Sequence, residues 1–229
     1  ITVRDWSSDV CSSDLNSLPW FQLGTCTNAA GETVQGDLNC FFQGVDGTNA
    51  WSGSFMTGFF PIMMFALPAA ALAMWHTAKP AKRKATGALM VSVALTAFLT
   101  GVTEPLEYAF AYVAFPLYAI HAVLTGLALV IVNALGIKTG FTFSAGLFDY
   151  LINMGKSSDL SGGFIQGPIM LIVIGLAYAA VYYFLFRFLI TKFGFRTPGR
   201  EDDETDGFQE AQAIAAEATG KNAEAARKR

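Results

Sequence analysis

The chain has 229 residues, of which 53% are hydrophobic and only 14% are charged, and its mean hydropathy is +0.41. An ordinary soluble domain carries about 25% charged residues, so this composition argues against a soluble enzyme. The net charge of −3, without a basic patch of interleaved aromatic residues, gives no indication of nucleic-acid binding.

The charges are unevenly distributed along the sequence. Only six of them lie between residues 86 and 186, whereas 16 lie between 187 and 229, and residues 47–78 carry none. About 20 mostly apolar residues are enough to cross the hydrocarbon core of a bilayer. The predicted fold class is therefore all-α: a polytopic membrane protein with a polar C-terminal segment.

The first fifteen residues do not have the pattern of a targeting segment. Residues 1–15 lack a positively charged start followed by an apolar run, so they do not form a secretory signal peptide. Their DWSSDVCSSDL stretch resembles the translation of a common sequencing-adapter oligonucleotide. We expect this segment, including Cys11, to be an artefact outside the fold; a natural loop rich in Ser and Asp is the alternative.

Residues 16–54 are predicted to form a polar, structured loop, because they are rich in Gly, Asn and Thr and show neither a helical nor a strand period. A short hairpin around Gly31 or Gly36 is expected. Cys26 and Cys40 could pair only in an oxidising compartment, and nothing in the sequence fixes their geometry, so free thiols are the favoured interpretation. With no CxxC and two histidines, no metal site is expected.

Apolar runs predict three membrane spans. Residues 55–75 form the first, kinked by two prolines; the small-residue-rich stretch 86–100 forms the second, and 165–190 the last. Basic residues follow the first span at 79–84 and the last at 187–200. By the positive-inside rule, both basic segments are placed in the cytoplasm.

The number of crossings between these basic segments must be even. Residues 106–135 are a 30-residue apolar stretch interrupted by Pro116, and residues 141–153 are too few to cross. A single full crossing by the first stretch would leave the C-terminal segment on the wrong side. We therefore expect re-entrant or broken helices in one of these stretches, which are tolerated where they line a wet cavity, and a substrate site there.

Glu104 is the most informative single position. An ionisable side chain between two apolar segments is costly to bury and indicates a functional site. Pro105 turns the preceding residue away from helical geometry, so the GVTEP turn, with Thr103, should present backbone and carboxylate to one polar cavity. A carboxylate suits a sugar, because it can accept hydrogen bonds from two hydroxyls. An interfacial loop whose Glu104 and Glu107 touch water remains open.

Other candidates have equally ordinary alternatives. Glu107 could share the pocket, although capping the first turn of the next helix is favoured. His121 is expected to be packed and hydrogen-bonded, with lining of the cavity as the alternative. Phe143 and Ser144 of the GFTFSAG turn offer a stacking ring and a hydroxyl, or simply pack in the bundle. Asp149 has no evident partner. The chain contains none of the common nucleotide-binding or hydrolase motifs, so it is not expected to be an independent enzyme.

Four ordered motifs carry a family resemblance: FFPIMMFALPAAALAM, FLTGVTEPLEYAF, GFTFSAGLFDY and RTPGRED. They resemble the membrane permease (IIC) component of the bacterial phosphoenolpyruvate-dependent sugar phosphotransferase system, glucose superfamily. WFQLGTCTNAAG followed by FMTGFFPIMM is similar to the N-acetylglucosamine branch rather than the glucose branch. The resemblance implies the C-terminal half of a IIC fold, with residues 55–195 as its membrane region and helical hairpins around the pocket.

The resemblance also implies a mechanism. A homodimeric inner-membrane permease would carry the sugar in an elevator-like movement. A phosphocysteine on a cytoplasmic IIB domain, itself supplied by IIA, would phosphorylate the 6-hydroxyl, whose proton Glu104 would accept as the catalytic residue. With the candidates above, the predicted substrate-binding set is Asn16, Thr103, Glu104, His121, Phe143 and Ser144. No cofactor is implied.

The C-terminal segment completes this interpretation. Residues 196–229 are predicted to be a charged cytoplasmic linker towards a IIB domain that this chain lacks, and the N-terminal half of the permease is expected to be missing as well. Phosphotransfer therefore belongs to the whole complex. The alternatives are an ion-coupled secondary sugar transporter, which needs no phosphotransfer partner, and a truncated, inactive membrane fragment. The RTPGRE sequence favours the phosphotransferase interpretation.

Overall fold

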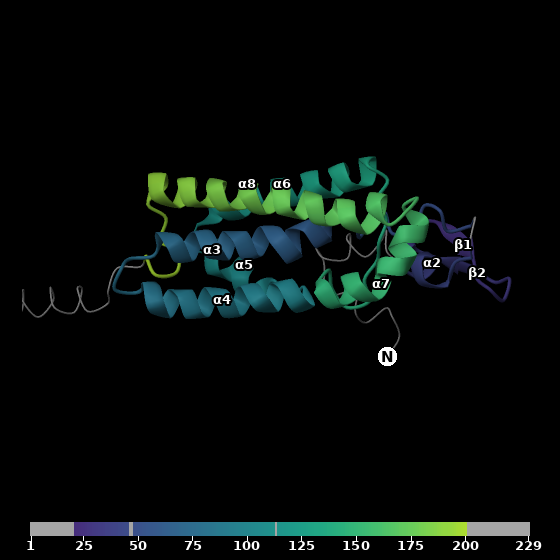
Figure 1. Cartoon of the computed structure of the whole chain (residues 1–229), viewed down its shortest axis with the longest axis horizontal. Helices are drawn as coiled ribbons and strands as arrows, with labels where there is room; N and C mark the ends of the chain where they lie inside the picture. Colours follow the sequence, from purple (N-terminus) through teal and green to yellow (C-terminus); the bar gives the residue numbers. More distant parts are fainter. Residues whose placement is uncertain (1–20, 46–47, 113, 201–229) are drawn as a thin grey trace, which may run out of the picture.

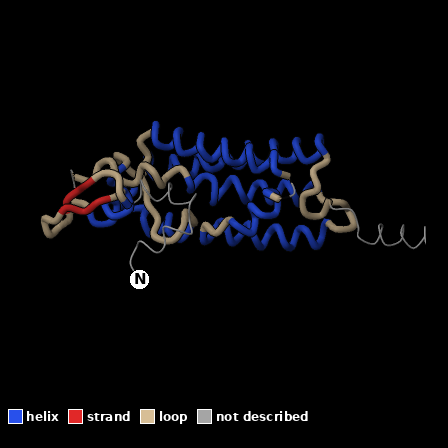
Figure 2. Tube along the Cα trace, turned by 180° about the vertical axis from the view of Figure 1, so that it is seen from behind, coloured by secondary structure: helices blue, strands red, loops and turns tan. Residues whose placement is uncertain are grey.

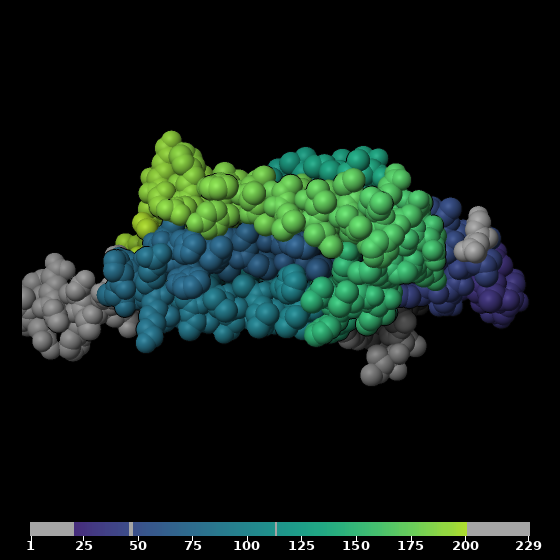
Figure 3. Space-filling model, viewed as in Figure 1, coloured from purple at the N-terminus to yellow at the C-terminus, as the bar shows by residue number. Residues whose placement is uncertain are grey.

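The computed structural model describes residues 21–45, 48–112 and 114–200. Helical rods lie lengthwise beside one another in a bundle, and a smaller cap with two short strands covers one end of it (Figures 1 and 2). In the space-filling view α8 (Met170–Phe193) extends along the bundle above α3 (Leu67–Thr77) and α4 (Arg83–Thr100) (Figure 3). This helical architecture confirms the predicted fold class.

Two helical segments of the described residues are long and apolar enough to cross a membrane. These are α6 (Phe115–Ala134) and the continuous helix Ile165–Phe193. The latter begins with a π-helical turn, η2 (Ile165–Ile169), which contains Pro168, and continues as α8. The Tyr150 hydroxyl donates to the Pro168 carbonyl at 2.9 Å, so side chains as well as backbone support this wide turn.

The first predicted span is shorter than expected. A π-helical turn, η1 (Pro61–Ala66), leads into α3, and residues 51–58 form turns instead of helix. Gly58 explains part of this difference, because a Cβ there would lie 2.4 Å from the Leu129 Cα. The segment therefore approaches α6 more closely than a helix with ordinary side chains would allow. Pro61 stands in the first turn, where the missing N–H of proline costs no helical hydrogen bond, and Pro68 stands where η1 passes into α3.

The long apolar stretch after α4 is broken, as predicted. It divides into α5 (Glu104–Ala111) and α6, and Pro116 stands in the first turn of α6. The two helices pack against each other, and the end of α6 lies near the cap (Figure 1). The stretch is therefore a short helix followed by a long one, which agrees with the expected broken helix, and the even number of crossings between the basic segments stays a prediction.

The two basic segments lie at the same end of the bundle, opposite the cap. The Lys79 N–H donates to the Gly199 carbonyl at 2.9 Å, and Arg200 Nη1 donates to the Thr77 carbonyl at 2.9 Å. A Cβ on Gly199 would lie 2.3 Å from Thr86 Oγ1, so the chain after α8 is held tightly against the start of α4. The shared location is confirmed; the cytoplasmic side stays a prediction.

The polar loop folds into the cap. Strands β1 (Thr25–Thr27) and β2 (Thr33–Gln35) pair antiparallel, with Gly31 at φ 80° in the turn between them, so the hairpin prediction is confirmed. Helix α2 (Asp37–Gln43) follows directly.

The expectation of free thiols is wrong, because Cys26 and Cys40 form a disulfide. The hairpin and the return of α2 bring their Cα atoms to 5.7 Å, an approach that sequence spacing alone does not reveal.

Asp37 ties the cap to the chain that leads into the bundle. Its fully buried carboxylate accepts hydrogen bonds from the N–H groups of Gly53 at 2.6 Å and Phe55 at 3.2 Å. Burial raises the pKa of Asp37 to about 6, although the two backbone hydrogen bonds oppose this shift. On the other side, Lys156 Nζ in α7 (Leu147–Leu160) donates to the Phe42 carbonyl at 2.9 Å. The cap is thus attached to the bundle at several points.

Candidate functional site

The GVTEP and GFTFSAG turns lie in direct contact. Gly101 ends α4 with φ 76°, and the Ser144 hydroxyl donates to its carbonyl at 2.9 Å. A Cβ at Gly101 would meet Ser144 Oγ at 2.6 Å and the Gly146 nitrogen at 2.8 Å. Glycine is required here both for its left-handed conformation and for this close approach.

The predicted site residues differ in exposure. Glu104 is exposed at the first residue of α5, and Thr103 directly before it is buried. Phe143 is 72% exposed, whereas the Ser144 hydroxyl is used to hold the two turns together. This arrangement favours the packed-turn alternative for Ser144 and the water-exposed alternative for Glu104. Asn16 lies outside the described residues.

Asp149, for which the sequence suggested no partner, shapes the second turn. It is buried, and its Oδ1 accepts hydrogen bonds from the backbone N–H and the hydroxyl of Thr142, both at 2.8 Å. Its Oδ2 accepts a weaker one from the Ser144 N–H at 3.3 Å. Asp149 therefore holds the backbone that carries Ser144, and the seven-residue separation from Thr142 gave no recognisable signal.

A cavity of about 430 Å³ lies between η1, α5 and α6. This volume is within the roughly 300–1,000 Å³ typical of small-molecule sites. Its wall combines two charged or titratable groups with aromatic and apolar ones. It is lined by Phe59, Ile62, Met63, Glu107, Tyr118, His121, Ala122, Thr125, Gly126 and Leu129.

Glu107 and His121 meet across this wall. Glu107 Oε1 lies 3.7 Å from His121 Nε2, with the Glu107 side chain 26% exposed and the His121 side chain 9% exposed. Helix capping was the favoured interpretation of Glu107, and Glu107 does lie in the first turn of α5, but its carboxylate also faces a side chain on another helix. Sequence reasoning underrated this residue, because nothing local in TEPLE indicates which helix the second acid faces.

His121 satisfies both interpretations made from the sequence. Its Nδ1 lies 3.0 Å from the Tyr182 hydroxyl, so it is packed and hydrogen-bonded, and it also lines the cavity. Tyr182 is fully buried on α8 and stacks on Phe186. Sequence reasoning did not single out Tyr182, because α8 contains three tyrosines and nothing local shows which of them faces His121.

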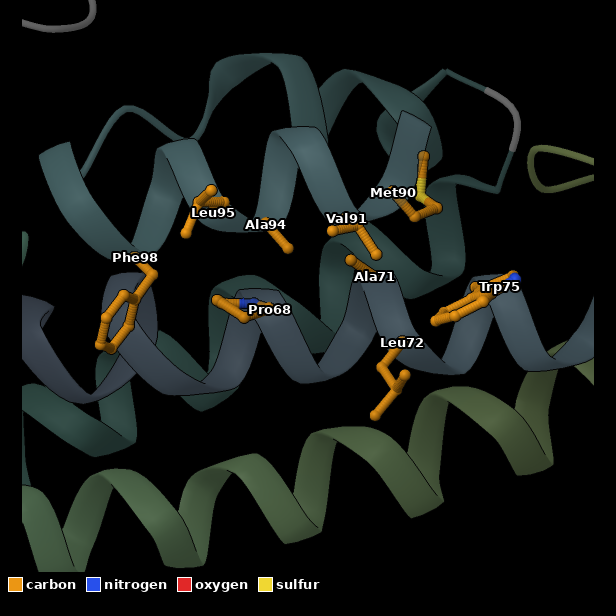
Figure 4. Close-up of a pocket in the computed structure, with 9 residues that line it drawn as sticks. All are labelled: Pro68, Ala71, Leu72, Trp75, Met90, Val91, Ala94, Leu95 and Phe98. Carbon is orange, nitrogen blue, oxygen red and sulfur yellow. The ribbon is translucent and has the colours of Figure 1, made fainter. Parts of the chain in front are cut away.

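Two further cavities have different chemistry. One of about 330 Å³ lies between α3 and α4 and has an almost entirely apolar wall (Figure 4). It is lined by Pro68, Ala71, Leu72, Trp75, Met90, Val91, Ala94, Leu95 and Phe98. The other, of about 450 Å³, is lined by Lys79, Arg196 and Arg200 at the basic end. Neither combines a carboxylate with aromatic faces, so the cavity with Glu107 is the better candidate for a sugar.

Comparison with known proteins decides the family. The profile described as "Phosphotransferase system, EIIC" matches residues 13–126. The chain is also 52% identical over 192 residues to the PTS system N-acetylglucosamine-specific EIICB component of Bacillus subtilis (strain 168). The aligned region covers 84% of this chain and 39% of that protein. The chain belongs to the phosphotransferase system EIIC family.

Other relatives of this EIIC chain have similar names. It is 50% identical over 190 residues to the N-acetylglucosamine-specific EIIC component of Streptomyces coelicolor, covering 83% of this chain and 43% of that one. It is 49% identical over 194 residues to the EIICBA component of Escherichia coli (strain K12), covering 84% and 28%. The EIIC chain thus spans less than half the length of each of these relatives.

Family membership confirms the resemblance found in the motifs. EIIC proteins are membrane permeases, which agrees with the two long apolar helices. The match with the family profile ends at residue 126 and so includes the GVTEP turn, Glu107 and His121. The roles of individual site residues stay predictions.

Proposed function

We propose that this EIIC chain is the sugar-binding membrane part of a phosphotransferase-system permease for N-acetylglucosamine. The observation that carries the proposal is the similarity to relatives whose names specify this sugar, at about half identity over 84% of the chain. Glucose is the alternative sugar that the motifs leave open. The cavity between η1, α5 and α6 supports a sugar ligand, since it offers a carboxylate, an imidazole and aromatic rings.

The proposed reaction is phosphoryl transfer to the 6-hydroxyl of the sugar. The hydroxyl oxygen forms the new P–O bond, the S–P bond of the IIB phosphocysteine breaks, and the hydroxyl proton passes to Glu104. Exposure of Glu104 on its turn supports this role, because the carboxylate is accessible to a docking partner. Relatives named EIICB and EIICBA support IIB and IIA as partners. Residues 196–229 would form the linker to IIB.

A movement must accompany this transfer. Helix α4 has 18 residues and separates the basic end from the GVTEP turn, which corresponds to roughly 27 Å at 1.5 Å per residue. A phosphocarrier docked at the basic end does not reach the turn at rest. We therefore propose that a homodimeric inner-membrane permease carries the sugar towards the cytoplasmic side, as in an elevator, with the basic end and the C-terminal segment in the cytoplasm.

The test uses the gene of this chain in its genomic context, expressed with its phosphocarriers in a host that lacks N-acetylglucosamine uptake. Labelled N-acetylglucosamine should accumulate as the 6-phosphate, and Glu104→Gln should lower the rate at least about tenfold, as expected for loss of a general base. Asp159→Asn, which removes an exposed acid from α7, is the matched control and should leave the rate unchanged.

Four outcomes would contradict parts of the proposal. Preference for glucose would overturn the assignment of the sugar. Uptake of unmodified sugar driven by an ion gradient would identify a secondary transporter instead. Undiminished phosphorylation by the Glu104→Gln variant would show that Glu104 does not accept the proton. Absence of any uptake would support the alternative of an inactive fragment.

A further inference from the structure

A chain of polar side chains connects α5, α6 and α8 inside the apolar bundle. It runs from the Glu107 carboxylate to His121 Nε2 at 3.7 Å, and from His121 Nδ1 to the Tyr182 hydroxyl at 3.0 Å. Buried polar groups are costly unless they are paired. These groups are paired one after another; Glu107 and His121 line the cavity of about 430 Å³, whereas Tyr182 is fully buried.

The aromatic surroundings fix the imidazole in place. Phe110, Tyr118 and Tyr182 lie around His121 at centroid distances of 5.8, 6.1 and 6.0 Å. The Thr125 hydroxyl donates to the His121 carbonyl at 2.9 Å, which fixes the backbone. His121 therefore has little freedom to turn away from Glu107.

Tyr182 can satisfy the ring in either of its protonation states. When the imidazole is neutral with its proton on Nε2 towards Glu107, Nδ1 accepts the proton of the Tyr182 hydroxyl. When the imidazole is charged, Nδ1–H donates to the Tyr182 oxygen, and the hydroxyl proton can turn to the His121 carbonyl at 3.4 Å. The position of His121 thus does not depend on one tautomer.

Glu107 also separates two adjoining cavities. It lines the cavity of about 430 Å³ and a second one of about 310 Å³ between α5 and the start of α6. Tyr118 is the only other residue common to both linings. The second cavity is rich in aromatic side chains, lined by Glu107, Tyr108, Ala111, Tyr112, Phe115 and Tyr118. A carboxylate between aromatic faces suits a pyranose, which has polar edges and apolar faces.

We propose that Glu107 is the carboxylate that accepts hydrogen bonds from ring hydroxyls of the bound sugar, and that His121, held by Tyr182, is a positioning residue that aims it. This inference rests on the proposed function and deepens it by naming the group that binds the sugar. Glu104 lines neither cavity, so Glu107 adds a second carboxylate to the predicted substrate-binding set, and the proposed proton transfer stays with Glu104.

The first experiment measures KM and kcat for N-acetylglucosamine phosphorylation in the expression system above. Glu107→Gln should raise KM about ten- to a hundredfold, as expected for loss of hydrogen bonds to a charged group, with a smaller change in kcat. Tyr182→Phe should raise KM only a few-fold, because it acts through His121. Glu107→Asp, which keeps the charge, should restore part of the affinity. Asp159→Asn is again the control.

The second experiment separates sugar contact from a merely structural role. Wild type and Glu107→Gln are each tested with analogues that lack one ring hydroxyl. The wild type should lose affinity for the analogue that lacks the hydroxyl bound by Glu107, and Glu107→Gln should show no further loss for it. A change in protein folding would instead weaken all analogues by a common factor.

The outcomes are decisive. If wild type phosphorylates the sugar and Glu107→Gln keeps a normal KM, the inference fails and the proposed function stands. If every single-hydroxyl analogue loses the same factor in both proteins, Glu107 does not contact the sugar. If the wild type does not take up or phosphorylate N-acetylglucosamine, the proposed function itself fails, and this inference with it.

Discussion

The cap and the α5–α6 hairpin each contain a shielded acidic side chain, but the two acids have different partners. In the cap, Asp37 is fully buried, and the hydrogen bonds that it accepts among the described residues come from backbone N–H groups of a nearby segment. In the hairpin, Glu107 faces a side chain of another helix and keeps one side open to a cavity. The difference suggests that an acid paired with backbone organises the chain, whereas one paired with a fixed side chain remains available to a ligand.

The largest effect that can separate the two regions is removal of the disulfide. Replacing Cys26 and Cys40 together by Ser should lower the local free energy of unfolding of the cap, because the disulfide restricts the unfolded chain. The expected loss is about 3 kcal/mol, the value for a closed loop of this length. Hydrogen exchange of the cap and hairpin amides measures this. Sugar phosphorylation should change less than about twofold. Equal loss of protection in α5 and α6 would show that the two regions are not independent.

A smaller effect comes from the pH dependence of the cap. The pKa of Asp37 is raised from 3.8 to about 6, so the folded cap holds its proton more tightly than the unfolded chain. Its contribution to stability is complete below about pH 4 and is lost as the pH rises through 6, amounting to roughly 2–3 kcal/mol. Hydrogen exchange of cap amides, corrected for intrinsic rates, should show this slope.

Asp37→Asn should flatten the slope of cap stability between pH 4 and 6, because an amide does not titrate there. Glu32→Gln is the matched control: it changes an exposed acid of the same cap, and the slope should persist. A slope that remains in Asp37→Asn would assign the titration to another group and would remove Asp37 from the comparison.

The smallest effect compares two glycines with positive φ. Gly31→Ala in the cap, where nothing lies within 4 Å of the new Cβ, should cost only the left-handed conformation, about 1 kcal/mol. Gly101→Ala has the same conformational cost and also meets Ser144 and Gly146. Thermal unfolding in detergent should show a larger loss for Gly101→Ala, and only this variant should slow phosphorylation. If both variants lost the same stability and phosphorylated at the same rate, the contact between the GVTEP and GFTFSAG turns would not require glycine at position 101.

Local patterns predicted much of the fold. The last span, the break near Pro116 and the hairpin at Gly31 follow from properties of a few neighbouring residues, and the structure contains all three. The first predicted span is shorter in the structure, and the predicted span 86–100 lies in α4, which is not one of the two described helices that are long and apolar enough to cross a membrane. The positive-inside rule predicted that both basic segments lie at the same end, and the parity of crossings then predicted that an apolar stretch between them is broken. These features need no knowledge of which helices pack together.

Contacts between distant segments could not be predicted in the same way. The pairing of His121 with Tyr182 joins residues 61 positions apart, and the Cys26–Cys40 disulfide depends on how α2 folds back on the hairpin. Both are set by packing of separate elements, for which the sequence has no local signal. For the same reason the motif directed attention to Glu104, whereas the packed structure placed Glu107 in the cavity wall.

The two π-helical turns have a mechanical consequence. η1 and η2 each contain a proline and lead into α3 and α8, the central rods of the bundle, and η1 supplies Ile62 and Met63 to the cavity. A wide turn interrupts the regular hydrogen-bond ladder and so lowers the stiffness of a helix at that point. Each helix should therefore bend most easily at its π-helical turn, and for α3 that turn lies in the wall of the cavity that contains Glu107.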